Sequence, residues 1–292
     1  MKKIFLCLML CLLLLPAPAW GEGGERVIVC SFYPIRVFAE NLLRDVPDVR
    51  LETLAPAGTG CLHDFQLLTG DLRSLDGASA LLINGAGMED SILPLITREM
   101  RDLPVLDASQ DIALLEENGA YNPHIWLSVG NAIQMVGNLS EGLQALLPDD
   151  AERIAQNAED YQMRLQALRA ELIAGLSDID RRDIVTFHEA FPYLAEELAL
   201  RVVASVTVEP DEAPSPRMIA QVIEAIRAAG GCPLFNEPGI DSDALRTIAA
   251  ETGSPVYVLD PVTDGEPALD SYETKMRSNL RILKEALTDS PQ

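Results

Sequence analysis

The sequence predicts an α/β protein of two lobes, each with a mainly parallel sheet flanked by helices, joined by one long linking helix. Two observations predict this fold. In both halves of the 292-residue chain, short apolar segments typical of buried strands alternate with helical segments, as in parallel sheets with helical crossovers. Between the halves lies a proline-free segment that would form a helix of roughly 40 Å at 1.5 Å per residue.

The first lobe is predicted from four strand patterns and the helical patterns that alternate with them. The first strand pattern, RVIVCS, is an apolar run rich in β-branched residues, as expected of a strand covered on both faces. The predicted strands are 26–31, 49–54, 80–84 and 104–107, and the predicted helices are 35–43, 69–75, 92–100 and 131–147.

The linking helix is predicted over 150–176, where Asp150 follows Pro148 and supplies an N-cap. Its apolar residues recur at helical spacing and form one stripe. They are Ile154, Ala158, Tyr161, Leu165, Leu168, Leu172 and Ile173.

The second lobe repeats the alternation of strands and helices. We therefore divide the chain into a first lobe at 20–148, the linking-helix segment at 149–178 and a second lobe at 179–292. The predicted strands of the second lobe are 183–187, 201–206, 233–235 and 256–259, and its helices are 191–199, 216–229, 243–251 and 272–287.

Residues 1–19 predict an export signal. Lys2 and Lys3 precede an apolar run at 4–15, and Ala17-Pro18-Ala19 offers small residues to a signal peptidase. The run is shorter than the roughly 20 residues of a spanning helix, so we expect cleavage near Ala19 and no membrane anchor. We expect a periplasmic or otherwise extracytoplasmic protein that does not span the membrane.

The net charge excludes nucleic acid as a partner. The formal charge is −23, and such a surface repels phosphate backbones and anionic lipid. It also helps to concentrate cations, although solubility alone is a sufficient reason for it.

The three histidines of the chain all follow predicted strands. His63 lies in the loop after the second strand, His124 follows the last strand of the first lobe, and His188 follows the first strand of the second lobe. Asp260 ends the last strand. Because ligands of open α/β sheets bind beyond the carboxyl ends of the strands, two facing lobes could bring these four side chains to one cation. Three imidazoles and a carboxylate suit Zn²⁺ and also Mn²⁺ or Fe²⁺.

Two acidic residues adjoin these candidate ligands. Asp64 follows His63 and Glu189 follows His188. Either carboxylate could hold an imidazole N–H group and so orient the ring. Solvated or helix-capping roles fit both residues equally well, because neighbours in sequence often point apart.

The cysteines suggest a disulfide. Cys30 ends the first strand and Cys61 lies in the loop after the second. In an oxidising compartment we favour a Cys30–Cys61 bridge, which would stabilise the fold by about 3–4 kcal/mol. Two free thiols, or Cys61 as a soft metal ligand, are the alternatives. We expect Cys232 to be a free buried thiol.

At these residues the chain resembles the zinc/manganese substrate-binding proteins of bacterial ABC importers. The resemblance runs from about residue 27 to 287. Its most diagnostic stretches are His-Ile-Trp at 124–126 and His-Glu-Ala-Phe-Pro-Tyr at 188–193. The other stretches are SFYP at 31–34, the His63 loop, NGAGME at 84–89, PHIWL at 123–127, Glu237 and VLDP at 258–261.

The resemblance implies that His63, His124, His188 and Asp260 bind one divalent metal between the lobes. It also implies that a monomer delivers the metal to the membrane permease of an ABC importer. The family has either histidine or glutamate at position 188, and histidine there implies zinc in preference to manganese, in agreement with the metals that imidazole favours. Glu237 resembles an acid that the family keeps near the cleft, where it could join the hydrogen bonds of the site.

The chain also departs from the family pattern. Cys61-Leu62 replaces the usual Asp-Pro before the first histidine, and the His/Asp-rich loop of many zinc-importing members is absent. Both departures bear on which metal the site takes.

Two other functions compete with this interpretation. A secreted zinc hydrolase would use the histidines, a zinc-bound water, and Glu189 or Glu237 as general base. The sequence lacks the H-E-x-x-H pattern, and Asp260 would fill the position that water needs. An adhesin, or a member that has lost uptake, is the third possibility. We therefore expect metal binding without catalysis.

Overall fold

The computed structural model describes residues 24–56, 59, 62, 65, 67–117, 119–206, 214–240 and 242–288. The predicted signal segment, His63, Asp64 and Cys61 lie outside these residues. None of the helices within the described ranges combines the length and the apolar character needed to cross a bilayer.

The first sheet is parallel, with the order β2-β1-β3-β4. The RVIVC strand, β1, lies in the interior of this sheet, as the apolar composition of the strand predicts. The strands are β1 (Arg26–Cys30), β2 (Val49–Thr53), β3 (Ala80–Ile83) and β4 (Val105–Asp107), and the helices are α1 (Tyr33–Leu42), α2 (Thr69–Ser74), α3 (Leu93–Glu99) and α4 (Val129–Leu146).

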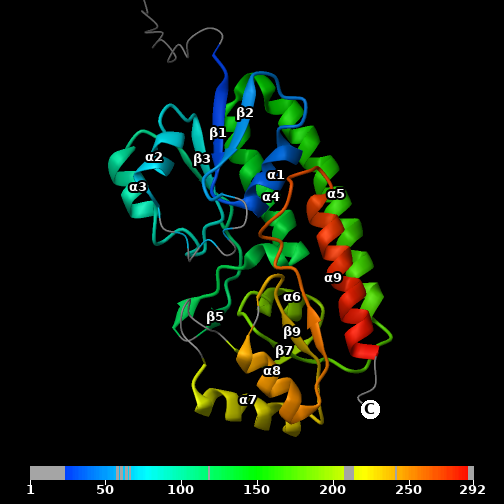
Figure 1. Cartoon of the computed structure of the whole chain (residues 1–292). Helices are drawn as coiled ribbons and strands as arrows, with labels where there is room; N and C mark the ends of the chain where they lie inside the picture. The colour runs from blue at the N-terminus through cyan, green and yellow to red at the C-terminus, as the bar shows by residue number, and fades with distance from the viewer. Residues whose placement is uncertain are drawn as a thin grey trace, which may run out of the picture.

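Helices cover both faces of this sheet (Figure 1). Because side chains alternate along a strand, Ile28 and Cys30 join the core under α1 and α4. Val29, between them, packs with Ile92 and Ile96 on the side of α2 and α3. The carboxyl ends of the strands, where the candidate ligands follow, are thereby fixed on one edge.

The second sheet is also parallel, with the order β10-β9-β7-β8. Two of its strands, β7 and β9, lie in the middle and end next to candidate site residues. The strands are β7 (Asp183–Thr186), β8 (Arg201–Ser205), β9 (Leu234–Asn236) and β10 (Val256–Val258), and the helices are α6 (Pro192–Glu197), α7 (Pro216–Ala228), α8 (Asp243–Thr252) and α9 (Ser271–Thr288).

The long helix α5 (Ala151–Leu176) packs against α4, α1 and α9. Six of the seven predicted stripe residues are buried. Ile173 is the exception, at 45% exposed, because it lies about 100° further round the helix than Leu172. Figure 1 shows α9 lying alongside α5, so the last helix of the chain braces the same side of the molecule as the linking helix. The residue boundaries given to the two lobes stay a prediction.

Several short elements were not predicted. β5 (Glu116–Glu117) and β6 (Ala120–Tyr121) form an antiparallel hairpin, and a 3₁₀ turn, η2, covers Ile125–Leu127. A second 3₁₀ turn, η3, covers Pro148–Asp150. The predicted N-cap role of Asp150 is wrong, since its side chain makes no capping hydrogen bond and instead pairs with Arg26 at 3.1 Å.

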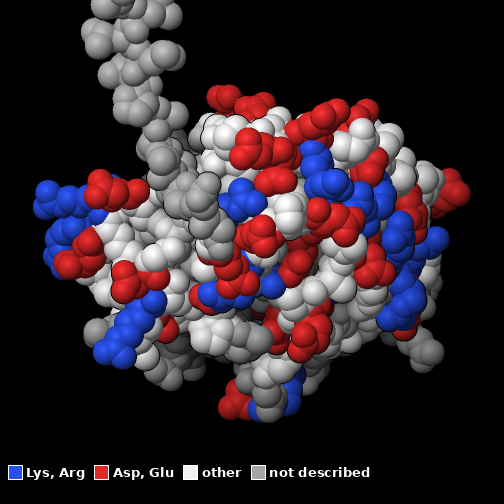
Figure 2. Space-filling model, turned by 90° about the horizontal axis from the view of Figure 1, so that it is seen from above, with Lys and Arg blue, Asp and Glu red and all other residues white. Residues whose placement is uncertain are grey.

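Charged side chains of both signs are interspersed on the face seen in Figure 2. Ion pairs include Arg44 of the first lobe with Asp160 of α5, and Arg50 with Glu25. These exposed pairs contribute little to stability individually. Their mixing means that the excess of acid is not gathered into one strong field on this face.

Candidate metal centre

His124 is completely buried, and its ring contacts the side chain of Asn122. It stands immediately before η2, and its backbone N–H donates to Asn122 Oδ1 at 3.0 Å. The same oxygen lies 2.9 Å from His124 Nδ1. An amide oxygen only accepts hydrogen bonds, so Nδ1 carries the proton and Nε2 keeps its lone pair. This is the tautomer that a metal ligand needs.

Asn122 also ties the His124 loop to the second lobe. Its Nδ2 donates to the backbone oxygen of Glu189 at 2.8 Å, and its own carbonyl accepts from Tyr193 Oη at 2.8 Å. The Tyr193 oxygen in turn accepts from Leu115 N at 2.9 Å. The backbone carbonyl of Glu189, the residue after His188, thus contacts the side chain that holds His124.

His188 is held in the same way by a carboxylate. It follows β7, and its Nδ1 lies 2.5 Å from Oε1 of Glu237, which follows β9. Both side chains are 16% exposed. Because Nδ1–H donates a hydrogen bond to the carboxylate, Nε2 again keeps the lone pair, and the carboxylate makes the ring a stronger electron-pair donor to a metal.

The two imidazoles meet across the lobes. Their ring centroids are 4.9 Å apart and their planes are nearly perpendicular, at 87°. Two imidazoles on one tetrahedral zinc, with Zn–N distances of about 2.0–2.1 Å, would place their centroids about 5 Å apart. The separation of His124 and His188 therefore suits two ligands of one cation.

Asp260 is held differently. Its Oδ1 accepts from Val262 N at 2.7 Å, and its Oδ2 is paired with Lys275 Nζ of α9. Asn279, also on α9, accepts from the backbone N–H of Asp260 at 2.9 Å and donates to its carbonyl at 2.8 Å. The carboxylate that we predicted as a metal ligand is thus the partner of an ammonium group.

These contacts do not by themselves complete a metal site. Among the described residues, no group of three or more His, Cys, Asp and Glu side chains is arranged to hold a metal. His63 and Asp64 are outside that set. The structure brings His124, His188 and Glu237 together and places Asp260 with Lys275.

The backbone after Asp260 is strained and tied to the first lobe. Val262 is buried, and its φ of +60° is unusual for a β-branched residue. Such a conformation costs on the order of 1–3 kcal/mol and persists only where neighbouring contacts enforce it. Trp126 Nε1 donates to the oxygen of Pro261 at 2.8 Å, and the Trp126 ring lies 5.3 Å from that of His124.

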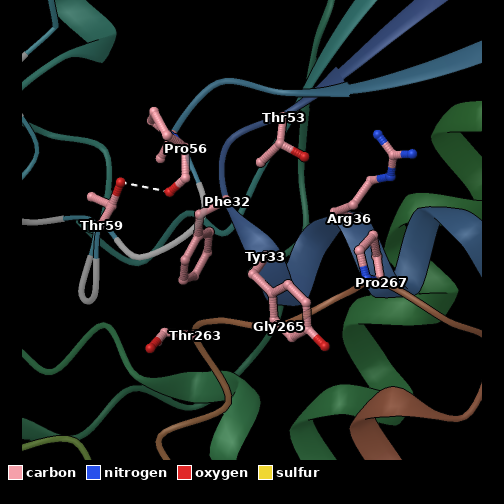
Figure 3. A pocket seen from close by; sticks show the side chains of 10 residues that line it. Phe32, Tyr33, Arg36, Thr53, Pro56, Thr59, Thr263, Gly265 and Pro267 are labelled. Atoms are coloured by element: carbon pink, nitrogen blue, oxygen red, sulfur yellow. Dashed lines mark hydrogen bonds between the residues drawn. The ribbon is translucent and has the colours of Figure 1, made fainter. Parts of the chain in front are cut away.

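A small cavity of about 90 Å³ lies beside this connection, lined from both lobes. Figure 3 shows Phe32 and Tyr33, at the start of α1, facing Thr263 and Gly265 of the loop that follows Asp260. Tyr33 Oη lies 3.4 Å from the Glu266 oxygen. Phe32, which lines the cavity, packs edge-on against Trp126, with ring centroids 5.0 Å apart. Because Trp126 also packs against His124, aromatic side chains connect the cavity to the His124 ring.

A buried acid, Glu89, supports the His124 loop indirectly, through Asn84. Both carboxylate oxygens of Glu89 accept backbone N–H groups, from Asn84 at 2.8 Å and Gly85 at 3.0 Å. Burial raises the pKa of Glu89 to about 7. Asn84 Nδ2 donates to the Pro123 oxygen at 3.0 Å, next to His124. Glu89 entered the sequence analysis only as part of the NGAGME stretch, and its supporting role was missed.

The glycine of that stretch is required by its surroundings. Gly85 has a φ of +75°, and a Cβ there would lie 2.0 Å from Asp107 Oδ1. Only glycine combines this backbone with so close a neighbour.

The cysteines differ from the predicted pairing. Cys30 is a free, buried thiol, and burial raises its pKa to about 12. Its side chain points into the core under α1, since it shares a strand face with Ile28. Cys61 lies outside the described residues. Cys232 is a buried free thiol, as predicted, and burial raises its pKa to about 11.

Comparisons with known proteins identify the family of this chain. Residues 28–286 match the family described as zinc-uptake complex component A periplasmic. The zinc-binding lipoprotein AdcA of Streptococcus pneumoniae serotype 4 is 30% identical over 308 residues, covering 98% of this chain and 61% of AdcA. The chain thus spans less than two thirds of that relative.

Solved structures show the same fold. FpvC of Pseudomonas aeruginosa in complex with Ni²⁺ has a TM-score of 0.81 and 28% identity, covering 90% of this chain and 97% of FpvC. FpvC has also been solved in complex with Mn²⁺. A zinc-bound deletion mutant of ZnuA has a TM-score of 0.80 and 26% identity, covering 91% of this chain and 100% of the mutant. The chain belongs to the family of zinc-uptake complex component A periplasmic proteins.

Proposed function

We propose that the chain is an exported substrate-binding protein that captures one divalent transition metal between its lobes and delivers it to the permease of an ABC importer. Zinc is the preferred metal and manganese the second. The observation that carries the proposal is the meeting of His124 and His188 from opposite lobes, with centroids 4.9 Å apart. In both rings the Nε2 lone pair can bind a metal, because Nδ1–H donates a hydrogen bond to Asn122 or to Glu237.

The proposed ligands are His63, His124, His188 and Asp260. Imidazole favours zinc, whereas a carboxylate at position 188 would favour manganese. The names of AdcA and ZnuA refer to zinc, and the FpvC structures hold Ni²⁺ or Mn²⁺. These relatives support a transition-metal cargo and leave its identity to measurement.

We propose that the protein performs no catalysis. A zinc hydrolase needs a general base near the metal-bound water. Glu237, one of the two candidates, accepts a hydrogen bond from His188 and so orients a ligand. A carboxylate used in this way is not available as the base. No observation favours the hydrolase or the adhesin over metal capture.

Calorimetric titration of metal-free protein with Zn²⁺ and Mn²⁺ tests the proposal. We expect one site per chain, tighter for Zn²⁺. His124→Ala should weaken zinc binding by more than about 100-fold, because loss of a ligand exceeds the 10–100-fold effect of losing a residue that orients one. Gln156→Ala, an exposed change on α5, is the control. Unchanged zinc affinity in His124→Ala would remove His124 from the site.

A further inference from the structure

Lys275 is one of few lysines in this chain, and it contacts a candidate metal ligand. After residue 19 the sequence has two lysines, Lys275 and Lys284, and the other basic residues are arginines. Lys275 Nζ is paired with Asp260 Oδ2, and both side chains are about three quarters buried, at 24% and 27% exposed. Lys284 is exposed on the same helix.

Hydrogen bonds hold Asp260 in place, so its carboxylate is not free to rotate away from Lys275 toward a metal. Asn279 holds the backbone of Asp260 on both sides, and Val262 N occupies Oδ1. Trp126 fixes the following residue, Pro261. Oδ1 already accepts a backbone N–H group and Oδ2 is the oxygen that Lys275 contacts, so a metal that takes Oδ2 competes with the ammonium group. The lysine stem is the flexible partner of this pair.

We infer that Lys275 withholds the Asp260 carboxylate from the metal and so biases the site toward zinc. This inference rests on the proposed function. A metal at Oδ2 has to displace the ammonium group, and an ammonium that stays nearby repels it. Mn²⁺ depends on carboxylate oxygen more than Zn²⁺ does, whereas imidazoles alone already suit zinc. Competition for this oxygen should therefore weaken manganese binding more than zinc binding.

The test compares substitutions on α9 in the full mature chain. Lys275→Met removes the charge and keeps the length of the stem, Lys275→Arg keeps the charge, and Lys284→Met is the matched control. Metal-free samples of each are titrated with Zn²⁺ and with Mn²⁺. We expect Lys275→Met to tighten Mn²⁺ binding by about tenfold or more and Zn²⁺ binding by clearly less. Lys275→Arg should keep the zinc preference of the unmodified chain, and Lys284→Met should not alter it.

Thermal unfolding gives a second readout that does not depend on fitting a binding curve. A ligand raises the melting temperature in proportion to the logarithm of its concentration over Kd. The shift caused by Mn²⁺ should therefore be larger in Lys275→Met than in the unmodified chain. The melting temperature of the metal-free variants shows that they are folded.

Three results would overturn the inference. One is an affinity for Mn²⁺ that is unchanged or weaker in Lys275→Met. Another is an equal gain for both metals, which would remove the effect on preference. The third is unchanged binding in Asp260→Asn, which would show that Asp260 is not a ligand. If His124→Ala still abolished zinc binding in that case, the proposed function would stand without this inference.

Discussion

His188 and Asp260 both follow strands of the second sheet, and both were predicted as metal ligands, yet their hydrogen-bond partners differ. A carboxylate, Glu237, accepts a hydrogen bond from His188 Nδ1–H and leaves the Nε2 lone pair for a metal. An ammonium, Lys275, takes an oxygen of Asp260. The position of a side chain at a strand end thus indicates where a ligand can be. Its partner decides whether that ligand is ready to bind a metal.

The first lobe resembles the His188 side of this comparison. His124 is oriented by Asn122, and its loop is supported by Asn84 and the buried Glu89. The two oriented imidazoles come from different lobes and face each other, whereas the carboxylate is held by α9. Substitutions in each region can break or sharpen this contrast.

The largest expected effect is at Glu89, through pH. Its pKa is raised from 4.5 to about 7 by burial, so the folded protein holds the proton more tightly than the unfolded chain. The stability that this provides is complete below pH 4.5 and is lost as the pH rises through about 7. The full loss is roughly 3 kcal/mol. Glu89→Gln removes this dependence.

Chemical denaturation at several pH values between 4.5 and 8 measures it. The unfolding free energy of the unmodified chain should fall relative to that of Glu89→Gln as the pH rises, while the other titrating groups act alike in both. Parallel pH profiles for the two proteins would show that Glu89 is not a perturbed acid.

Next is Glu237→Gln, which tests the orienting role on the His188 side. The amide can no longer serve as a negatively charged acceptor for Nδ1–H, and zinc affinity should fall by about 10–100-fold. Glu251→Gln, an exposed change on α8, is the control for titration. An unchanged zinc Kd in Glu237→Gln would mean that His188 does not depend on this carboxylate, and the contrast with Asp260 would lose its basis.

Trp126→Phe tests the link between the two sides. It leaves the buried oxygen of Pro261 without the donor that now lies 2.8 Å away. The loss of this bond should lower the unfolding free energy by about 1–3 kcal/mol. Zinc affinity should change less than in Glu237→Gln, because no ligand loses its own partner. A loss of zinc-binding free energy that exceeds the loss of unfolding free energy would instead show that Trp126 acts directly on the metal site.

Tyr33→Phe should have the smallest effect. The hydroxyl lies 3.4 Å from the Glu266 oxygen, which is long for an O–H···O hydrogen bond. We expect a change in unfolding free energy of under about 0.5 kcal/mol, below the usual net value of a good hydrogen bond. A loss above about 1 kcal/mol in denaturation would indicate that this interlobe contact holds the lobes together.

The fold was predictable because periodicity and strand composition report backbone structure directly. Both sheets and the long helix occur where alternating strand and helix patterns predicted them. The hairpin β5–β6 was missed since two-residue strands leave no periodic signal. Ile173 was assigned to the buried stripe because apolar character alone does not separate it from Leu172.

The site was predictable only in part. The rule that ligands gather at strand ends predicted that His124 and His188 would meet, and they do. The partners of two candidate ligands are more distant in the sequence, since Glu237 is 49 residues from His188. Lys275 is 15 residues from Asp260 and lies on a helix whose rotation is set by tertiary packing. Asn122 had a detectable signal, since it lies two residues before His124 and asparagine commonly bonds to nearby backbone.

X-ray absorption at the zinc edge, on protein loaded with one equivalent of Zn²⁺, tests the central claim most directly. We predict three imidazole nitrogens at about 2.0–2.1 Å and an oxygen completing the shell. Removing either His124 or His188 should reduce the number of imidazoles by one. A shell with fewer than two imidazoles in the unmodified chain, or a number of imidazoles that neither substitution lowers, would contradict a site built where the lobes meet.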